Sequence, residues 1–511
     1  MEYHNHNLTL LGLFMPKAFS EPIRDAGRFD RKWKVFFLVA VSIFMSTLDS
    51  SIVNVALPYM MQDLSSDVKT IQWVVLIYLT TVSSLLLTCG RLSDIKGRRN
   101  IYIGGFLVFV AGSLLCGLAE SSRFLIVSRA IQGGGAAMLM ACSPALIVDA
   151  FPAEERGKAI GMIGAVVAAG LTTGPVVGGV LLEFFSWRYI FYINIPIGVV
   201  ASFAALTVLN NPPARYTDGQ VIKSEPMDTL GGLLMAIGLS SVILFLTQVP
   251  DQGLFSPFSL GTAGLGAVAM ILFVFIETRL EYPLFDFNLL KIRRFVFPMI
   301  GSVILFAALF IVVFLMPFFL TYPCGFSAFR TGFIMMVPFL CLLVVSPVSG
   351  LIHDRYGSRA ICMAGMGLVV VSLLLLTGLT PSMTMENMLW RMTLAGLGTA
   401  LYISPNSTLI MSSVPAARRG IAAGALATAR NMGMVLGVAL AGLVFTHSFS
   451  TLTQGMSLDN YTPALEPFFM VSFKRAMAAG TVLSVLGLVV TYARGKETKK
   501  EITNHFGGVQ T

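Results

Sequence analysis

Fourteen stretches of about 20 or more apolar residues follow one another along this chain of 511 residues. A helix needs about 20 apolar residues to cross the hydrocarbon core of a bilayer, so each stretch predicts a transmembrane helix. The stretches at 229–248 and 260–278 are the weakest candidates, and twelve spans remain without them. We therefore predict an all-α polytopic membrane protein. Its predicted spans are 36–58, 71–89, 100–119, 124–149, 159–182, 189–210, 229–248, 260–278, 295–322, 331–352, 360–380, 387–413, 420–446 and 473–493.

The charged residues are few and lie mainly between the predicted spans. They make up 12% of the chain, about half their share in a soluble domain. With the N-terminus in the cytoplasm, 26 of the 35 Lys and Arg residues fall in cytoplasmic segments. By the positive-inside rule, this distribution predicts that both termini are cytoplasmic. The net charge of +9 is therefore an orientation signal, and nucleic acid is excluded as a partner.

The sequence repeats itself after about 260 residues. The pattern G-x-x-x-D-x-x-G-x-R occurs at 90–99 and again at 350–359, and several glycines and alanines in later spans recur at an offset of 263. Two related halves of six helices are therefore predicted. The predicted segments are a cytoplasmic N-tail (1–35), the first six-helix bundle (36–210), a linker with two additional transmembrane helices (211–294), the second bundle (295–493) and a cytoplasmic C-tail (494–511).

Duplicated halves in a membrane protein indicate alternating access, in which two bundles rock about a central site. A non-transporting membrane sensor is the alternative from another class, but the sequence shows no soluble output domain. We find no phosphate-binding loop for ATP and no nucleophile–base or metal constellation. We therefore expect no enzyme activity, no cofactor and no metal site, with the proton gradient as the source of energy.

Two ionisable residues lie deep in predicted spans of the first half. An ionised residue in the middle of a bilayer is costly, so each one is a functional candidate. Asp49 lies about thirteen residues into the first span, and Arg129 lies at a similar depth in the fourth. We expect Asp49 to load and release a proton under the influence of Arg129. The alternative is a static ion pair that joins the two spans.

Weaker candidates for coupling or substrate binding are polar residues in the same spans and in the thirteenth. These residues are Asn54, Gln132, Arg430 and Asn431. No carboxylate lies in the middle of a span in the second half. Substrate contacts do not follow from the spacing, although the many Phe and Met residues suit an adaptable apolar cavity.

The two repeated loops have a mechanical interpretation as a cytoplasmic gate. Glycines permit a tight turn between two helices, and an Asp can accept from a nearby Arg or a helix N-terminus. Such contacts would hold the cytoplasmic side shut, whereas the alternative is a basic loop with incidental spacing. The candidate gate residues are Gly90, Asp94, Gly97, Arg98, Gly350, Asp354, Gly357 and Arg359.

A glycine-rich run in the fifth span is either a hinge or a plain packing surface. Glycines allow neighbouring helices to approach closely, and a proline inside a helix removes one backbone hydrogen bond and bends it. The candidate hinge residues are Gly170, Gly174, Pro175, Gly178 and Gly179.

At these residues the sequence resembles the major facilitator superfamily, and specifically its fourteen-span drug:proton antiporters of the EmrB/QacA type. The resemblance covers nearly the whole chain and implies the major facilitator fold. Its first- and sixth-span motifs are the most specific. The matching segments are 48–58 (first-span motif), 90–99 (loop motif), 129–133 (fourth-span arginine motif), 170–179 (antiporter motif) and 187–198 (sixth-span signature).

The resemblance implies a proton-coupled antiporter that exports amphipathic drugs or other toxic small molecules. It implies a monomer in the plasma membrane, the inner membrane of a bacterium, with a periplasmic adaptor protein as an optional partner at the long outer loop 447–472. Some relatives that export cations carry a further carboxylate where this chain has Arg430 and Asn431, so neutral and anionic substrates stay open. An exporter of a specific metabolite, lipid or siderophore, and an uptake symporter, are the alternatives on the same fold.

Overall fold

The computed structural model describes residues 31–209, 216–217, 220–221, 228–253, 255–280, 287–415, 419–456, 458 and 461–495. This part of the chain is helical except for one short antiparallel hairpin, β1 (Tyr216–Thr217) with β2 (Gln220–Val221). The long helices are α1 (Arg31–Asp63), α3 (Trp73–Lys96), α4 (Arg98–Gly117), α5 (Ser122–Ala150), α6 (Arg156–Phe184), α8 (Asn194–Val208), α9 (Thr229–Gln252), α10 (Pro257–Glu277), α11 (Arg293–Thr321), α12 (Ala328–Tyr356), α13 (Ser358–Thr377), α14 (Met385–Ser412), α15 (Arg419–Thr453) and α16 (Glu466–Ala493).

Short helices precede two of these long ones. The helix α2 (Val68–Ile71) leads into α3, and α7 (Tyr189–Tyr192) leads into α8. Two 3₁₀ turns, Phe287–Lys291 and Pro463–Leu465, precede α11 and α16. Each of the fourteen predicted spans therefore corresponds to one long helix of the described chain.

Thirteen helices of the described chain are long and apolar enough to cross a membrane. The remaining long helix is α14, which corresponds to the predicted span 387–413. Its lower hydropathy has a local cause, because it carries Glu386 and Arg391 near its start and a polar run from Ser404 to Thr408. Within this run Pro405 and Asn406 are buried, whereas Thr408 is exposed.

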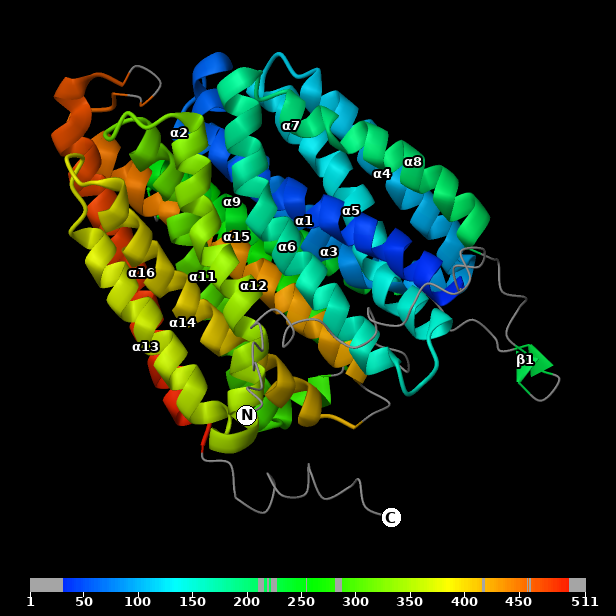
Figure 1. Ribbon diagram of the computed structural model, residues 1–511. Helices are drawn as coiled ribbons and strands as arrows, with labels where there is room; N and C mark the ends of the chain where they lie inside the picture. The colour runs from blue at the N-terminus through cyan, green and yellow to red at the C-terminus, as the bar shows by residue number, and fades with distance from the viewer. Residues whose placement is uncertain are drawn as a thin grey trace, which may run out of the picture.

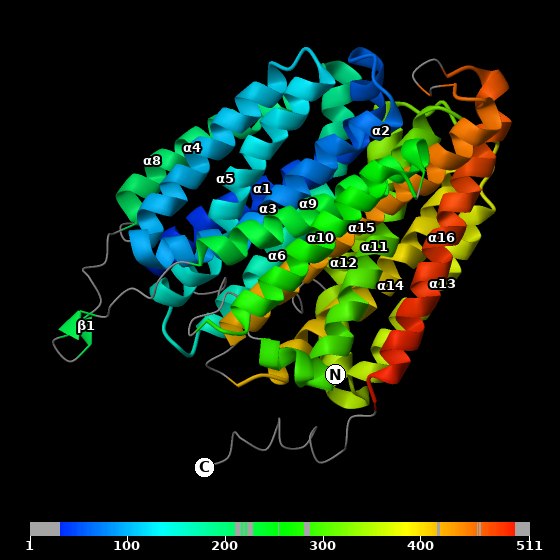
Figure 2. The ribbon, with the colours of Figure 1, turned by 180° about the vertical axis from the view of Figure 1, so that it is seen from behind.

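The helices form two bundles with an extra pair beside them (Figure 1). The first half contains α1 to α8, and the second contains α11 to α16. The first helix of each half is the most enclosed, and every residue from Leu305 to Leu320 of α11 is buried. Of the extra pair, α9 contacts both α3 and α15, whereas α10 packs on α9 and presents an apolar face to the outside (Figure 2).

The internal repeat of the sequence is also a repeat of packing. Gly170 of α6 lies against Thr47 of α1, and Gly433 of α15 lies against Val303 of α11. In the same way, Gly135 lets α5 approach α4, and Gly398 lets α14 approach α13. Small residues at equivalent positions therefore bring equivalent helix pairs into contact in both halves.

Two sequence-based expectations need correction. The predicted outer loop 447–472 is shorter, because α15 continues to Thr453 and α16 already begins at Glu466. Apolar and polar residues alternate on helical faces there, so hydropathy alone underestimates both helices. Similarly, α1 begins at Arg31, inside the predicted N-tail. A helix can extend beyond the apolar stretch that crosses the lipid.

Candidate functional site

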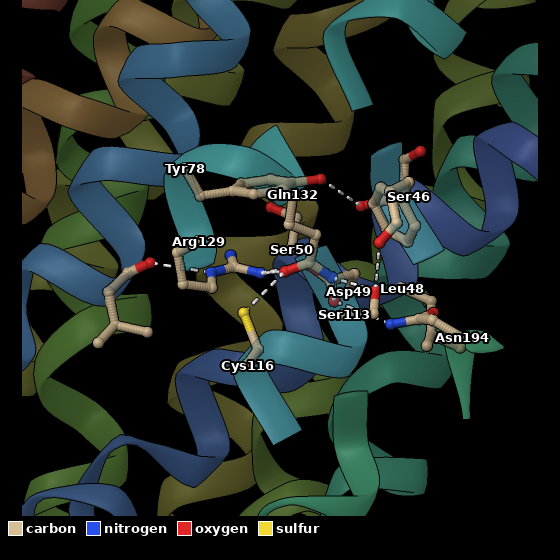
Figure 3. Close-up of polar contacts among 12 residues, drawn as sticks. Ser46, Leu48, Asp49, Ser50, Tyr78, Ser113, Cys116, Arg129, Gln132 and Asn194 are labelled. Carbon is tan, nitrogen blue, oxygen red and sulfur yellow. Dashed lines mark hydrogen bonds and ion pairs between the residues drawn. The ribbon is translucent and has the colours of Figure 1, made fainter. Parts of the chain in front are cut away.

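Asp49 lies in the middle of α1 and is completely buried. Its carboxylate is surrounded by three donors from two other helices, α5 and α8 (Figure 3). Arg129 Nη1 lies 2.5 Å from Oδ2, and the amide nitrogens of Gln132 and Asn194 donate to Oδ1 over 2.7 Å and 3.0 Å. A buried charge is tolerated only when it is paired and hydrogen-bonded, and Asp49 meets both conditions.

Arg129 is held in place along its whole guanidinium group. It comes from the second turn of α5 and is 1% exposed. Its Nε donates to the carbonyl oxygen of Val74 over 3.0 Å, and its Cζ lies 4.0 Å from the centre of the Tyr78 ring. Both partners belong to α3, so Arg129 links α5 to α1 and α3. Because the guanidinium is fixed, its attraction to Asp49 depends on whether the carboxyl group carries a charge.

Gln132 connects the ion pair to a wider network. Its Oε1 accepts from Arg129 Nη1 over 2.6 Å, and its Nε2 donates both to Asp49 and to the hydroxyl of Ser113 over 2.8 Å. The thiol of Cys116 lies 3.6 Å from the same Oε1. The structure therefore places Gln132, a weaker candidate from the sequence, at the centre of the site.

Asn194 is the site residue that the sequence analysis did not single out. It is the first residue of α8, which belongs to the sixth predicted span. Its side chain is fully buried and donates to Asp49. Its own Oδ1 has no partner within the described chain. A polar amide inside the apolar span 189–210 was the available signal, but an uncharged side chain carries less weight than an ion.

The other weaker candidates lie elsewhere. Asn54 is on α1 but donates to the backbone carbonyl of Ser50 rather than to Asp49. Arg430 lies in the second half and donates to Ser407 Oγ over 2.7 Å, while Asn431 beside it is half-buried. Of the candidate coupling residues, the structure therefore brings together Asp49, Arg129 and Gln132, in the first half of the molecule. The roles predicted for these residues stay predictions.

The loop residues are only partly arranged as the gate interpretation expects. Gly97 and Gly357 do form tight turns, with φ of +89° and +78°, where a side chain would be strained. Gly90 and Gly350, however, lie inside α3 and α12, so the expectation that they shape the turn is wrong. Arg98 pairs with Asp94 over 2.9 Å and also with Asp149 of α5.

The second copy of the loop is described less completely. The side chain of Asp354 lies outside the described residues. Arg359 lies with its Cζ 4.6 Å from the centre of the Tyr492 ring. Only the first loop therefore has a described network of charges that joins α3, α4 and α5.

The glycine-rich run of α6 is a packing surface with two sides. Gly170, Gly174 and Gly178 face α1, where they contact Thr47, Ser51 and Ile52. Gly179 faces the second half, since a methyl group there would lie 2.7 Å from the carbonyl oxygen of Ala328. Pro175 lies within the continuous helix α6, and its carbonyl oxygen lies against Gly332 of α12.

The contacts between α6 and α12 lie at one end of the molecule, where they join the two halves. We call this end, which is opposite Gly97 and Gly357, the outer end. Here the backbone N–H of Phe329 donates to Glu183 over 3.2 Å. The hydroxyl of Tyr322 donates to the carbonyl oxygen of Pro58 over 3.3 Å. Both hydrogen bonds join the first half to the second, so the halves meet at the outer end.

The described residues contain no group of three or more His, Cys, Asp or Glu side chains suited to a metal ion. The carboxylate of Asp49 accepts from three donors, Arg129, Gln132 and Asn194. Because these donors belong to α5 and α8, the carboxylate ties α1 to both of these helices.

Comparisons with known proteins support this architecture. The family model described as Major Facilitator Superfamily matches residues 39–438 and 298–504. The riboflavin transporter RibZ of Clostridioides difficile (strain 630) is 33% identical over 479 residues, which cover 93% of this chain and 100% of that protein. The multidrug resistance protein Stp of Mycobacterium tuberculosis (strain ATCC 25618 / H37Rv) is 32% identical over 406 residues, covering 79% and 74%.

A further relative and a solved structure agree. The methylenomycin A resistance protein of Bacillus subtilis (strain 168) is 31% identical over 413 residues, which cover 80% of this chain and 87% of that protein. A bacterial homologue of the human lysosomal transporter Spinster covers 92% of this chain and 98% of its own, with a TM-score of 0.65 and 14% identity. At that identity the likeness shows the fold alone. The predicted major facilitator fold is confirmed, and this multi-pass membrane protein belongs to the drug:proton antiporter family of the major facilitator superfamily.

Proposed function

We propose that the protein exports amphipathic small molecules in exchange for protons, by alternating access. One observation carries the proposal, namely that Asp49 is completely buried and is held by Arg129, Gln132 and Asn194. A static ion pair would need only one partner of opposite charge. Here the carboxylate joins three helices, α1, α5 and α8, so its protonation state is linked to their packing, which is what coupling requires.

We infer export rather than uptake from two supports. The run 170–179 resembles the antiporter motif, and it forms the contact between α6 and α12 that closes the outer end. Two of the relatives are named for resistance to drugs or to an antibiotic. We further propose that the protein acts as a monomer in the inner membrane of a bacterium, with both termini in the cytoplasm, and that a periplasmic adaptor is not required for transport.

A second candidate is a transporter dedicated to one metabolite. The similarity to RibZ, which covers that whole protein, favours this candidate and makes riboflavin the metabolite to test first. Riboflavin carries an aromatic ring system with an apolar dimethylbenzene end and a polar hydroxylated chain, so it also fits the broader class of amphipathic substrates. The same experiment separates the two candidates.

The test is transport into proteoliposomes under a pH gradient imposed in either direction, with riboflavin and a diverse panel of drugs. Antiport predicts accumulation when the lumen is acidic, because protons leave as substrate enters. A symporter accumulates substrate under the opposite gradient, and a sensor shows no flux. Transport of riboflavin alone would identify the dedicated transporter. No transport of any compound under either gradient would contradict both candidates.

The matched variants are Asp49→Asn and Glu120→Gln, which both replace a carboxylate with an amide. Asp49→Asn leaves Arg129 uncompensated, and breaking a buried pair costs about 3–5 kcal/mol, so a folded sample must be selected first. We expect this variant to lose accumulation under a pH gradient but to keep exchange of substrate without a gradient. Glu120 is exposed, so Glu120→Gln should behave as the native protein. Undiminished proton coupling in Asp49→Asn would contradict the role of Asp49.

A further inference from the structure

A second guanidinium lies inside the membrane and has no role in the site around Asp49. Arg430 is on α15, eleven residues after that helix begins at Arg419. At 1.5 Å per residue this is about 16 Å from the start of the helix, which is far from either end of a membrane span. Arg430 is half-buried rather than sealed in protein. A charged residue at this depth is costly, so it calls for a partner.

The partners that Arg430 has are neutral. Its Nη2 donates to Ser407 Oγ of α14 over 2.7 Å, and its Cζ lies 5.9 Å from the centre of the Phe306 ring of α11. Within the described chain it has no ion pair. A guanidinium carries five N–H donors in a planar fork, and one hydroxyl satisfies only one of them. Most of its donors are therefore directed at something other than described protein acceptors.

Comparison with Arg129 shows that this arrangement is not forced by the fold. Arg129 is 1% exposed and is neutralised by Asp49, whereas Arg430 is half-buried and has no ion pair within the described chain. At the repeat offset of 263, the counterpart of Arg430 in the first half is Val167 of α6. An apolar residue therefore suffices at the equivalent position for the packing of α6. The three charges compared here are therefore distributed unequally. Asp49 and Arg129 form a balanced pair in the first half, and Arg430 is a positive charge in the second half.

The helix α15 lies where the two halves meet, whereas the described contacts of Arg430 are with α11 and α14 of the second half. Gly442 packs against Gln72, and Gly424 packs against Leu87, so α15 lies along α3 of the first half (Figures 1 and 2). On α14, Asn406 is buried and donates to Ser302 of α11 over 2.8 Å. Since successive helical residues point about 100° apart, its neighbour Ser407 faces a different direction and stays half-exposed.

We propose that Arg430 binds the acidic group of the transported molecule, which makes amphipathic monoanions with a carboxylate or phosphate group the preferred substrates. The inference rests on the proposed transport function and adds the charge of the cargo to it. Guanidinium groups bind carboxylates and phosphates through two parallel hydrogen bonds, which a single hydroxyl does not replace. The buried ring of Phe306 lies beside the guanidinium and helps to hold it in position.

The test compares carboxylates with the matching carboxamides, which have the same size and shape but no charge. The probes are 7-methoxycoumarin-3-carboxylate and naphthalene-2-carboxylate, each with its carboxamide, and binding to the purified full-length protein is measured by calorimetry. We expect the native protein to bind the carboxylates at least about tenfold more tightly, as charge-assisted pairing implies. Arg430→Gln should remove this preference, and Arg430→Lys should retain part of it.

The matched control is Arg391→Gln, in a second arginine of the same half. Arg391 donates to the carbonyl oxygen of Asn387 over 3.0 Å and lies over Trp390 near the start of α14, so this variant should keep the preference. Equal affinities for acids and amides in the native protein would overturn the proposal, as would a preference that survives in Arg430→Gln. Thermal unfolding shows whether each variant is folded.

This experiment is independent of proton coupling. Binding is measured without a gradient, so failure of the proton-exchange proposal leaves the carboxylate preference intact. Conversely, a protein that couples transport to protons but ignores substrate charge would overturn the role of Arg430 alone. Exchange of preloaded carboxylate in proteoliposomes, again without a gradient, then shows whether the bound acid is also carried. An acid that binds at Arg430 but is never exchanged would contradict its identification as cargo.

Discussion

Asn194 holds the carboxylate of Asp49 from α8, although its side chain carries no charge. A hydrogen bond to an ionised group stabilises it by about 1.5–3 kcal/mol. Replacing Asn194 by Leu, which has the same branched shape and the same number of side-chain heavy atoms, removes that donor from the carboxylate. We therefore predict that Asn194→Leu weakens proton-driven accumulation of substrate, measured in proteoliposomes under a fixed pH gradient.

Asn406→Leu provides the matched control for this prediction. Asn406 is as buried as Asn194, but it lies in the second half and contacts Pro298 and Ser302 instead of Asp49. Both variants lose a buried amide, so both are expected to lose stability by a similar amount. Only Asn194→Leu should weaken proton-driven accumulation. An equal loss in both variants would mean that the lower accumulation reports general destabilisation.

At the scale of single residues, the sequence indicated the ions better than the neutral groups around them. Asp49 and Arg129 are conspicuous because charge is rare in the spans, and the structure brings them together. The depths of Asp49 and Arg129 in their spans did not indicate Asn194, because its hydrogen bond to Asp49 depends on how α8 packs beside α1. Asn54 shares the helix of Asp49 but bonds to its own backbone, which residue type alone does not reveal.

At the scale of helices, the contact between α6 and α12 depends on a glycine that the sequence analysis did not name. A methyl group on Gly332 would overlap the carbonyl oxygen of Pro175, which belongs to the backbone and cannot rotate away. Overpacking of this kind typically costs about 1–3 kcal/mol. We predict that Gly332→Ala lowers the midpoint of thermal unfolding and slows transport, because the outer closed arrangement is destabilised.

Gly367→Ala is the control, since Gly367 also lies inside a helix but has nothing within 4 Å of the added methyl group. Alanine favours helix over glycine by about 1 kcal/mol, so the stability of this variant should be unchanged or slightly higher. If Gly332→Ala behaved in the same way, close approach of α6 and α12 would not be needed for the closed outer end.

Hydropathy predicted which segments are helices but not where all of them end. It reproduced the order of fourteen long helices because each crosses the same thickness of lipid. It failed between α15 and α16, where residues 447–453 and 466–472 are helical although they lie outside the predicted spans. It also placed Gly90 in a turn because glycine is compatible with both states, and only Gly97 has the positive φ that requires it.

At the scale of the whole molecule, alternating access requires the contacts at the outer end to break in each cycle. Glu183 and Phe329 lie on opposite sides of this interface and are joined by a hydrogen bond of 3.2 Å. We predict that cysteines at these two positions, joined by a short thiosulfonate cross-linker, stop transport, and that reduction restores it. The native cysteines are replaced first, although burial raises the pKa of the Cys324 thiol in the nearby loop to about 12 and keeps it poorly reactive.

The control pair separates movement between the halves from movement within one. Lys32 of α1 and Glu155, just before α6, form an ion pair of 2.9 Å that lies entirely in the first half. If each half moves as a body, cysteines joined at these positions should leave transport intact, because their distance does not change. Full transport with Glu183 and Phe329 cross-linked would contradict rocking of the two halves. Loss of transport with the control pair would instead place the movement inside the first bundle, between α1 and α6.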